Sequence, residues 1–356
     1  MLKSVSGGIA LGTLTTGTIA NEGPFESIVT VRGKDGVPRK TTEVPKQWWD
    51  HEQKVLEIQD NLEKQFRVND PKVNNGIDSV AIANQSNRVS GRYISKLKVY
   101  VSSKSGLKVD IPDKVDGVPV DQAETKAHVP DSCGKEYVDV LRGGIAVDEP
   151  DNTGPGTATC MVERNGKYYI MTACHVVATT CTEPLGVSVY NYHDGGNYIG
   201  DVEDCQIGED WAIINKASDS NISYFENEIY SQPGILAGHV TKNGLLNLKS
   251  SGTWVYHQGW ATCESIGLVG EIDVPVKACD SNGITYKDNH YVKVSTPTDG
   301  GDSGGPHFHK YTKDGYDRLA IIAPHYGGES VGCAAYHIHE SDNINFDPMF
   351  DEDTSP

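Results

Sequence analysis

The sequence is short of basic residues and of long apolar runs. Among its 356 residues, 31 Lys and Arg stand against 49 Asp and Glu, which gives a formal net charge of -18. Because a phosphate backbone calls for a basic surface, this charge argues against nucleic-acid binding. No apolar stretch after the first 20 residues is long enough to cross a bilayer. The composition therefore disfavours both a nucleic-acid-binding protein and one with a membrane span.

Cysteine is absent from the first 130 residues, whereas eight cysteines follow. Residues 1–20 hold one lysine, an apolar run and several threonines, a pattern typical of a signal segment and too short and polar for a membrane anchor. In an exported chain, an even number of cysteines indicates a disulfide framework. We therefore expect a secreted, extracellular protein whose disulfide bonds lie after residue 130.

The first third of the chain differs in character from the rest. Residues 47–66 place apolar side chains at helical spacing after a proline, and strand-like runs follow at 80–83, 94–101 and, more weakly, 115–120. This pattern predicts a small α+β N-terminal domain over residues 21–129, followed by an exposed polar linker. The sequence leaves open whether this unit is a pro-region or a permanent accessory domain.

The most informative stretch is Gly-Asp-Ser-Gly-Gly-Pro at residues 301–306. Glycines allow the backbone to approach a reacting carbonyl closely. The amides of Gly301 and Ser303 are therefore candidates for an oxyanion hole, and Ser303 is a candidate nucleophile. An ordinary glycine-rich turn is the alternative, but it does not explain the two motifs described next.

A nucleophilic serine needs a base and an acid that orients the base. His175 follows an apolar strand-like run and is the candidate base. Asp210 directly precedes the apolar run 211–214, which would carry its carboxylate into the interior. Asp201 and Asp204 are competing orienters, but neither is followed by a comparable run. The order along the chain is therefore His, Asp, Ser.

The segments Thr-Ala-Cys-His (172–175), Asp-Trp-Ala-Ile-Ile (210–214) and Gly-Asp-Ser-Gly-Gly-Pro resemble the signature segments of chymotrypsin/trypsin-like serine proteases. The resemblance spans residues 138–339 and follows the family's motif order. It implies a protease domain at residues 130–345, built as an all-β pair of six-stranded antiparallel barrels at 138–223 and 225–339. It also implies that the triad lies between the barrels and that Asp302 turns inward toward a buried positive charge.

The resemblance bears on the cysteines but does not settle their pairing. Cys160 lies fifteen positions before His175, where family members place a half-cystine. Its usual partner, directly after the histidine, is replaced by Val176. Cys174 then pairs either with Cys160 or with Cys181, and the sequence does not decide between them.

Three residues carry the expected substrate preference. Thr298 lies five positions before Ser303, where the family lines its primary specificity pocket. The segment His-Tyr-Gly-Gly at 325–328 resembles the His-Trp-Gly-Gly segment of glutamate-specific endopeptidases. This resemblance implies that Thr298, His325 and Gly327 bind an acidic side chain before the cleaved bond. The alternative is that His325 only packs against the pocket wall.

Two His-x-His pairs, His307/His309 and His337/His339, would each lie on one side of a strand and could in principle bind zinc. Without a third ligand at clear spacing, a structural role is favoured, so we assign no metal-binding residues and expect no organic cofactor. The sequence leaves a structural calcium ion open. Residues 346–356 form an acidic tail that we expect to be solvated.

The resulting expectation is a monomeric serine endopeptidase that acts on proteins or peptides through an acyl-enzyme. Two alternatives stay open. One is a protease-shaped binding or regulatory module without activity, and the other is a serine esterase on the same fold.

Overall fold

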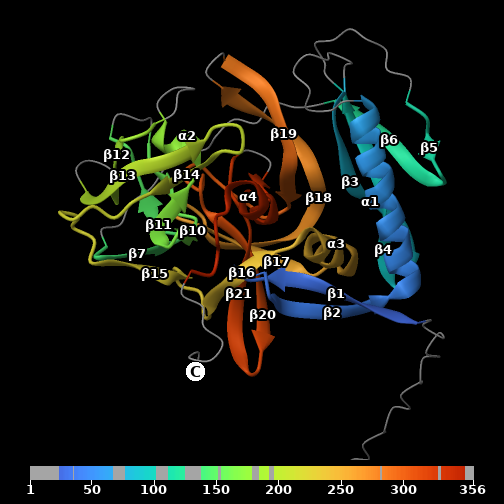
Figure 1. The fold of residues 1–356 in the computed structure, drawn as a ribbon, viewed down its shortest axis with the longest axis horizontal. Coiled ribbons are helices and arrows are strands. Elements are labelled where there is room, and N and C mark those ends of the chain that lie inside the picture. The colour runs from blue at the N-terminus through green and yellow to red at the C-terminus, as the bar shows by residue number, and fades with distance from the viewer. Residues whose placement is uncertain are drawn as a thin grey trace, which may run out of the picture.

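The computed structural model describes residues 24–34, 36–66, 77–101, 111–124, 138–150, 154–178, 184–191, 196–280, 283–327 and 330–348 (Figure 1). The expected signal segment, residues 125–135 of the expected linker and most of the acidic tail lie outside these ranges. Strands dominate the described residues and are gathered into two main sheets.

The smaller sheet has five strands, in the order β10-β11-β14-β13-β12, and every neighbouring pair is antiparallel. Its strands are β10 (Cys160–Arg164), β11 (Lys167–Thr172), β12 (Ser188–Asn191), β13 (Asn197–Gln206) and β14 (Trp211–Ile214). The β10–β11 hairpin turns at Asn165 and Gly166, both with positive φ, as the Asn-Gly pair predicts.

Two strand pairs and a short helix complete this half of the molecule. The strand β7 (Val140–Gly143) pairs with β15 (Tyr224–Ile229), and β8 (Ala146–Val147) pairs with β9 (Gly156–Thr157). The single-turn helix α2 (Cys174–Val177) follows β11. Buried apolar side chains fill the space between these elements, including Leu141, Met161, Ile170, Ile199 and Ile214.

The larger sheet has thirteen strands. Its C-terminal members are β16 (Ile235–Val240), β17 (Trp254–Gly259), β18 (Cys263–Asp280), β19 (Gly283–Val294), β20 (Pro306–Lys313), β21 (Tyr316–Pro324) and β22 (Val331–Cys333). Register shifts in the long β18–β19 hairpin accompany the arc that this hairpin follows in Figure 1. The helices α3 (Lys242–Ser251) and α4 (Ala335–Asp342) pack beside this sheet.

The N-terminal third continues this larger sheet. It consists of β1 (Phe25–Arg32), β2 (Pro38–Pro45), α1 (Lys46–Phe66), β3 (Ile77–Val89), β4 (Arg92–Val101), β5 (Lys114–Val115) and β6 (Val118–Glu124). The predicted helix and the strands at 80–83 and 94–101 are confirmed, whereas the run at 115–120 is divided by a turn at Asp116 and Gly117 between β5 and β6. However, β1 pairs with β16 and β3 pairs with β18, so the region has no sheet of its own.

The mostly β architecture is as expected, but the strand numbers differ from two barrels of six. One sheet has five strands and the other has thirteen. The second is larger because N-terminal strands join it, with β1 pairing to β16 and β3 pairing to β18. The pairing is also not antiparallel throughout, since β16 runs parallel to β21. The domain boundary at residue 129 stays a prediction.

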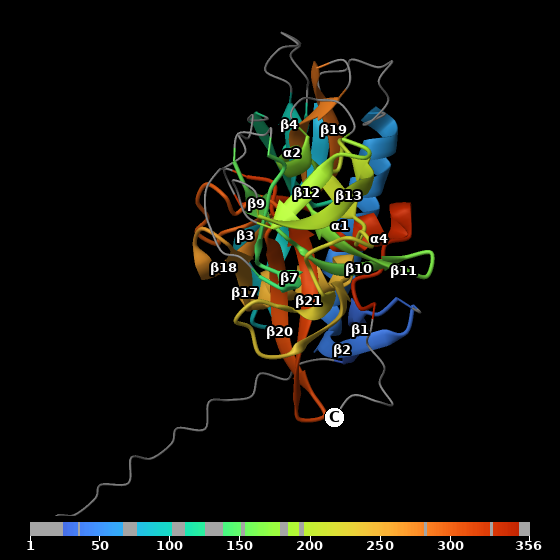
Figure 2. The same ribbon diagram turned by 90° about the vertical axis from the view of Figure 1, so that its left-hand side faces the viewer.

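Buried polar contacts join the N-terminal third to the C-terminal half. The ammonium of Lys249 on α3 donates to Ser95 Oγ at 2.9 Å, and Ser95 Oγ donates to Glu52 Oε2 at 2.6 Å. The Asp273 carboxylate on β18 accepts a hydrogen bond from Gln59 Nε2 at 2.7 Å and forms an ion pair with Lys242 Nζ at 2.8 Å. Figures 1 and 2 show that α1 and the five-stranded sheet lie on opposite sides of the molecule. These buried contacts therefore lie at the side away from the five-stranded sheet.

Candidate active site

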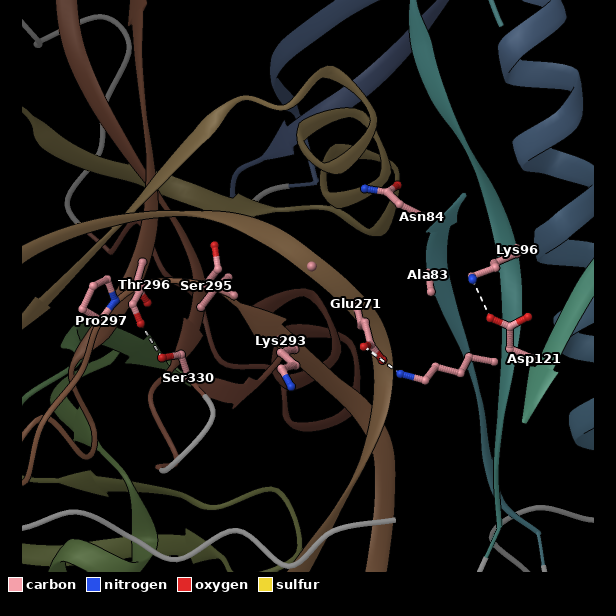
Figure 3. A pocket seen from close by; sticks show the side chains of 13 residues that line it. Ala83, Asn84, Lys96, Asp121, Glu271, Lys293, Ser295, Thr296, Pro297 and Ser330 are labelled. Atoms are coloured by element: carbon pink, nitrogen blue, oxygen red, sulfur yellow. Dashed lines mark hydrogen bonds and ion pairs between the residues drawn. The ribbon is translucent and has the colours of Figure 1, made fainter. Parts of the chain in front are cut away.

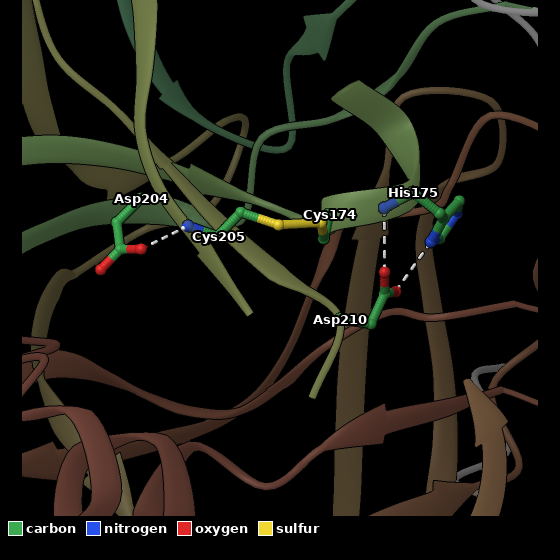
Figure 4. The surroundings of a disulfide bond; sticks show 5 residues. All are labelled: Cys174, His175, Asp204, Cys205 and Asp210. Atoms are coloured by element: carbon green, nitrogen blue, oxygen red, sulfur yellow. Dashed lines mark hydrogen bonds and ion pairs between the residues drawn. A yellow bond between two sulfur atoms is a disulfide. The ribbon is translucent and has the colours of Figure 1, made fainter. Parts of the chain in front are cut away.

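His175 and Asp210 are brought together where α2 meets the start of β14 (Figure 4). Asp210 Oδ2 lies 2.7 Å from His175 Nδ1, and Asp210 Oδ1 accepts the backbone N–H of His175 at 2.9 Å. The Asp210 side chain is 5% exposed and that of His175 is 21% exposed. A buried carboxylate on Nδ1 fixes the tautomer of the imidazole, so that Nε2 carries the lone pair.

The two competing aspartates are engaged elsewhere. Asp201 Oδ1 accepts hydrogen bonds from Ser188 Oγ and Tyr198 OH, both at 2.9 Å. Asp204 forms an ion pair with Arg164. Asp210 is therefore the one of the three candidates whose carboxylate bonds to the imidazole of His175.

The disulfide of this region joins Cys174 to Cys205, with the Cα atoms 5.9 Å apart. Both pairings that the sequence left open are wrong for Cys174: Cys160 is a buried thiol, and Cys181 lies outside the described residues. The physical reason is the register between β13 and β14, which pairs Cys205 with Ala212 and so brings Cys205 close to the residues that follow β11. The disulfide fixes the base of α2, directly before His175.

The loop that carries Ser303 packs against the same region. Ser303 is 1% exposed, and its carbonyl oxygen accepts the N–H of Thr157 at 2.6 Å. Thr157 Oγ1 donates to the carbonyl of Gly301 at 2.7 Å. A Cβ atom on Gly304 would lie 2.2 Å from Thr157 O and 2.9 Å from Ala173 N, so the close approach requires glycine there. The serine loop thus lies against the residues that lead into His175.

Tyr326 contacts both sides of the candidate triad. Its ring meets the His175 imidazole edge-to-face, with centroids 5.4 Å apart. Ser303 Oγ lies 3.5 Å from the carbonyl oxygen of Tyr326. Tyr326 directly follows His325 in the His-Tyr-Gly-Gly segment, but no pattern in the sequence predicts its contact with His175.

Asp302 turns inward, as the resemblance implied, and is fully buried. Its Oδ1 atom accepts the amides of Ala261 and Thr262 at 3.0 and 3.1 Å, and its Oδ2 atom lies 3.7 Å from His257 Nε2. Burial by itself raises the pKa of Asp302, but the nearby His257 imidazole and the donors of Asp299 and Thr262 outweigh burial and leave the pKa below its usual value. A Cβ atom on Gly259 would lie 1.8 Å from Oδ1, so the cradle requires glycine.

The predicted specificity residues Thr298 and His325 are the ends of one polar chain. Thr298 Oγ1 lies 3.2 Å from Ser330 Oγ, which donates to the carbonyl of Thr296 at 2.5 Å. Thr296 Oγ1 lies 3.4 Å from His307 Nδ1, and His307 Nε2 lies 3.2 Å from His325 Nδ1. The His307 ring also lies against a third buried imidazole, since its centroid is 4.6 Å from that of His257.

The third predicted specificity residue, Gly327, is buried and bridges to Val331, while Gly328 lies outside the described residues. His307 and Ser330 were not predicted to line this region. They join this region through contacts between segments that are distant in the sequence. Such contacts leave no regular spacing from which they could be predicted.

The two His-x-His pairs have different environments. His307 and His309 lie on β20 as expected for a strand, but His337 and His339 lie on α4, so the strand interpretation is wrong for the second pair. Burial lowers the pKa of His309 to about 4, with Lys40 adding to the effect. Within the described ranges, no group of three or more His, Cys, Asp or Glu side chains has an arrangement that could hold a metal ion.

Comparison with protein-family models gives no match. Comparison with curated proteins also gives no match. Similar solved structures include Thermobifida fusca protease A (14% identity, TM-score 0.42) and Nocardiopsis protease (17% identity, TM-score 0.42). A glutamic-acid-specific serine protease, described as using a histidine triad in substrate binding, is 18% identical with a TM-score of 0.40.

Each comparison covers 58% of this chain and 97%, 98% and 99% of the respective solved chains. The matched part is thus a little more than half of this chain and almost the whole of each solved chain. The function proposed below is argued from the residues of the site.

Proposed function

We propose that this protein is a serine endopeptidase whose catalytic residues are His175, Asp210 and Ser303. The observation that carries the proposal is the pair of hydrogen bonds that the Asp210 carboxylate accepts from His175, beside the buried loop that carries Ser303. Tyr326 supports the proposal, because its ring contacts the His175 imidazole and its backbone carbonyl lies near Ser303 Oγ.

The chemistry follows from these groups. Ser303 Oγ attacks the scissile carbonyl while His175 Nε2 takes the hydroxyl proton, and the carbonyl electrons move to the oxygen. The amides of Gly301 and Ser303 would stabilise this oxyanion. The imidazolium, stabilised by Asp210, then gives its proton to the leaving amine, and a C–N bond breaks to leave an acyl-enzyme. Water then attacks the acyl-enzyme ester while His175 takes its proton, and breakage of the C–O bond releases the carboxylic acid product and free Ser303.

We also propose a preference for Glu or Asp at the residue before the cleaved bond. Thr298 offers a hydroxyl, and His325 offers an imidazole that is backed by a second imidazole at 3.2 Å. Burial lowers the pKa of His307 well below its usual value, so this histidine is neutral when no acid is bound. A substrate carboxylate would accept hydrogen bonds from the His325 imidazole and the Thr298 hydroxyl.

A panel of peptide anilides tests both the proposed peptidase activity and the proposed preference for an acidic residue before the cleaved bond. We expect cleavage after Glu to exceed cleavage after Ala, Phe or Arg by about tenfold or more in kcat/KM, which corresponds to one well-placed charge interaction. Thr298→Val should reduce the preference for Glu, whereas Thr312→Val, at an exposed position on β20, should not. A preference for Arg or Phe over Glu would end the acidic-specificity proposal.

The same panel separates the alternatives. Hydrolysis of esters without hydrolysis of anilides or proteins would support an esterase, and hydrolysis of neither would support a binding module. No observation in the described residues favours either of these over the peptidase.

The proposed site of action is outside the cell. The Cys174–Cys205 disulfide is typical of proteins that mature in an oxidising compartment. In the described part of the chain, no helix has the length and apolar character needed to span a membrane. The proposed partners are protein or peptide substrates, and we propose that the protein acts as a monomer.

A further inference from the structure

A cavity of about 620 Å³ opens between the N-terminal third and the C-terminal half (Figure 3). Strands β3, β4 and β6 line its N-terminal side, and β18, β19 and the residues that follow β19 line the rest. Because Ala83 on β3 pairs with Glu271 on β18, both sides belong to one continuous part of the larger sheet. A volume of this size accommodates one or two amino-acid side chains. The cavity is therefore large enough to take part of a peptide.

The cavity shares a wall with the proposed specificity pocket. Thr296, Pro297 and Ser330 line it on one side in Figure 3. Ser330 Oγ lies 3.2 Å from Thr298 Oγ1, and Thr296 is bonded to the His307–His325 pair. A polypeptide whose acidic side chain enters the specificity pocket would therefore pass close to this cavity.

The cavity gathers positive charge in an acidic chain. Lys96, Lys98 and Lys293 line it, against the two carboxylates Asp121 and Glu271. The lining therefore has more ammonium groups than carboxylates, whereas the whole chain has a formal charge of -18. Such an excess favours an anionic ligand.

The lysines can reach a ligand without leaving buried carboxylates unsatisfied. Lys98 Nζ lies 2.9 Å from Glu271 Oε1, while Glu271 Oε2 also accepts a hydrogen bond from Tyr100 OH. Lys96 pairs with Asp121 at 2.5 Å, but the Asp121 side chain is 50% exposed. Exposed pairs of this kind contribute only about 0–1 kcal/mol, so exchanging one carboxylate partner for another changes little.

We propose that this cavity is an accessory subsite for a second carboxylate of an acidic polypeptide substrate, held by Lys96, Lys98 and Lys293. The inference rests on the proposed endopeptidase function and extends it from one substrate position to at least two. Because Lys96 and Lys98 lie on β4, the subsite is complete only when the N-terminal third is part of the working enzyme.

Equilibrium binding to the full chain carrying Ser303→Ala tests the subsite without cleavage. The probes are two labelled octapeptides that share a central Glu, one with Glu and one with Gln at the flanking positions. In low salt we expect the Glu-flanked peptide to bind about tenfold more tightly, the effect of two or three modest charge contacts. Adding Lys98→Gln or Lys293→Gln should reduce the affinity ratio of the two peptides to about threefold or less. In the chain that carries only Ser303→Ala, 1 M salt should also reduce this ratio.

Lys310→Gln is the matched control. Lys310 and Lys98 are both 26% exposed, and each pairs with a glutamate and lies over a tyrosine ring, but Lys310 does not line the cavity. An unchanged ratio in both cavity variants, or an equal loss in Lys310→Gln, would overturn the inference. Thermal melting of each variant shows whether a loss reflects unfolding, and Lys293→Gln gives a second reading if Lys98→Gln does not fold.

Cleavage of a single-residue Glu anilide by the active chain tests the proposed function separately. If the anilide is not cleaved but the peptide ratio is present and sensitive to the lysines, the endopeptidase proposal fails and the acidic-peptide subsite stands. If the anilide is cleaved but the ratio is near one, the subsite fails and the endopeptidase stands.

Discussion

The two halves of the candidate site are stabilised in different ways. His175 and Asp210 belong to the five-stranded half, where an apolar core and the Cys174–Cys205 disulfide fix a short stretch of chain. Ser303 belongs to the thirteen-stranded half, whose sheet and core include strands from residues 25–124. The base and its orienting acid therefore depend on nearby sequence, whereas the half that carries the nucleophile includes the distant segment of residues 25–124.

The polar contacts show the same contrast. Lys249 and Asp273 are almost fully buried, and each bonds across the junction to a polar side chain of the N-terminal third, Ser95 and Gln59 respectively. Burial lowers the pKa of Lys249 to about 8, although Glu52 opposes the shift. Removing one partner of such a set leaves a buried charge without compensation, which is strongly destabilising.

The largest expected effect is on catalysis in the five-stranded half. Asp210→Asn should lower kcat by about 10⁴-fold, because the amide no longer holds the tautomer with the lone pair on Nε2. The melting temperature should change little, since size and burial are kept. Steady-state kinetics with a Glu anilide and a thermal melt measure the two quantities. A loss of less than about tenfold would show that Asp210 does not orient the base.

The next effect concerns the junction. Lys249→Met should lower the free energy of unfolding by roughly 3–5 kcal/mol, because the Glu52 carboxylate then lies buried without its ammonium partner. Adding Glu52→Gln should restore much of the loss. Lys64→Met is the control, since Lys64 is 72% exposed and pairs with an exposed aspartate. Urea unfolding measures all three, and a loss below about 1 kcal/mol for Lys249→Met would remove the contrast between the halves.

The disulfide gives a smaller, local effect. Replacing Cys174 and Cys205 together by Ser should lower stability by about 2–4 kcal/mol, because the bond closes a loop with a sequence separation of 31 residues. Activity should be lost at a lower temperature than in the unmodified chain, since α2 begins at Cys174. Cys263→Ser, at an exposed reduced cysteine, should change neither. Equal melting curves for all three proteins would contradict this expectation.

The smallest effect is a pH dependence at the junction. Burial, and then the nearby Asp273, raise the pKa of Glu63 on α1 from 4.5 to about 7. The folded state therefore binds the Glu63 proton more tightly than the unfolded state. This contribution is complete below pH 4.5 and is lost as the pH rises through 7, by roughly 1–3 kcal/mol.

Urea unfolding at several pH values between 4.5 and 7.5 measures this slope. Glu63→Gln should flatten it, whereas Glu57→Gln, at an exposed position on the same helix, should leave it unchanged. A slope that is the same in both variants would assign the pH dependence to other groups.

The sequence predicted those parts of the structure that depend on local pattern. The helix at 47–66 follows from apolar spacing, and the contact between His175 and Asp210 follows from recognised motifs whose order reflects a known chemistry. The inward turn of Asp302 was also expected from the motif. In each case a short segment contains the information.

What could not be predicted depends on pairing between distant strands. The continuation of β18 by β3 and the pairing of Cys174 with Cys205 are set by register across the sheets, and no spacing in the sequence encodes it. The buried set of Glu52, Ser95 and Lys249 is missed for the same reason. The position of His337 and His339 was misjudged because an alternation of two residues is too short to distinguish a strand from a helix.

The proposed triad is tested most directly by covalent labelling with a fluorophosphonate and intact-mass analysis. The proposal predicts one adduct per chain, located at Ser303 by peptide mapping, absent in Ser303→Ala and strongly slowed in His175→Ala. A chain that is folded but takes no label, or that is labelled equally in Ser303→Ala, would contradict it.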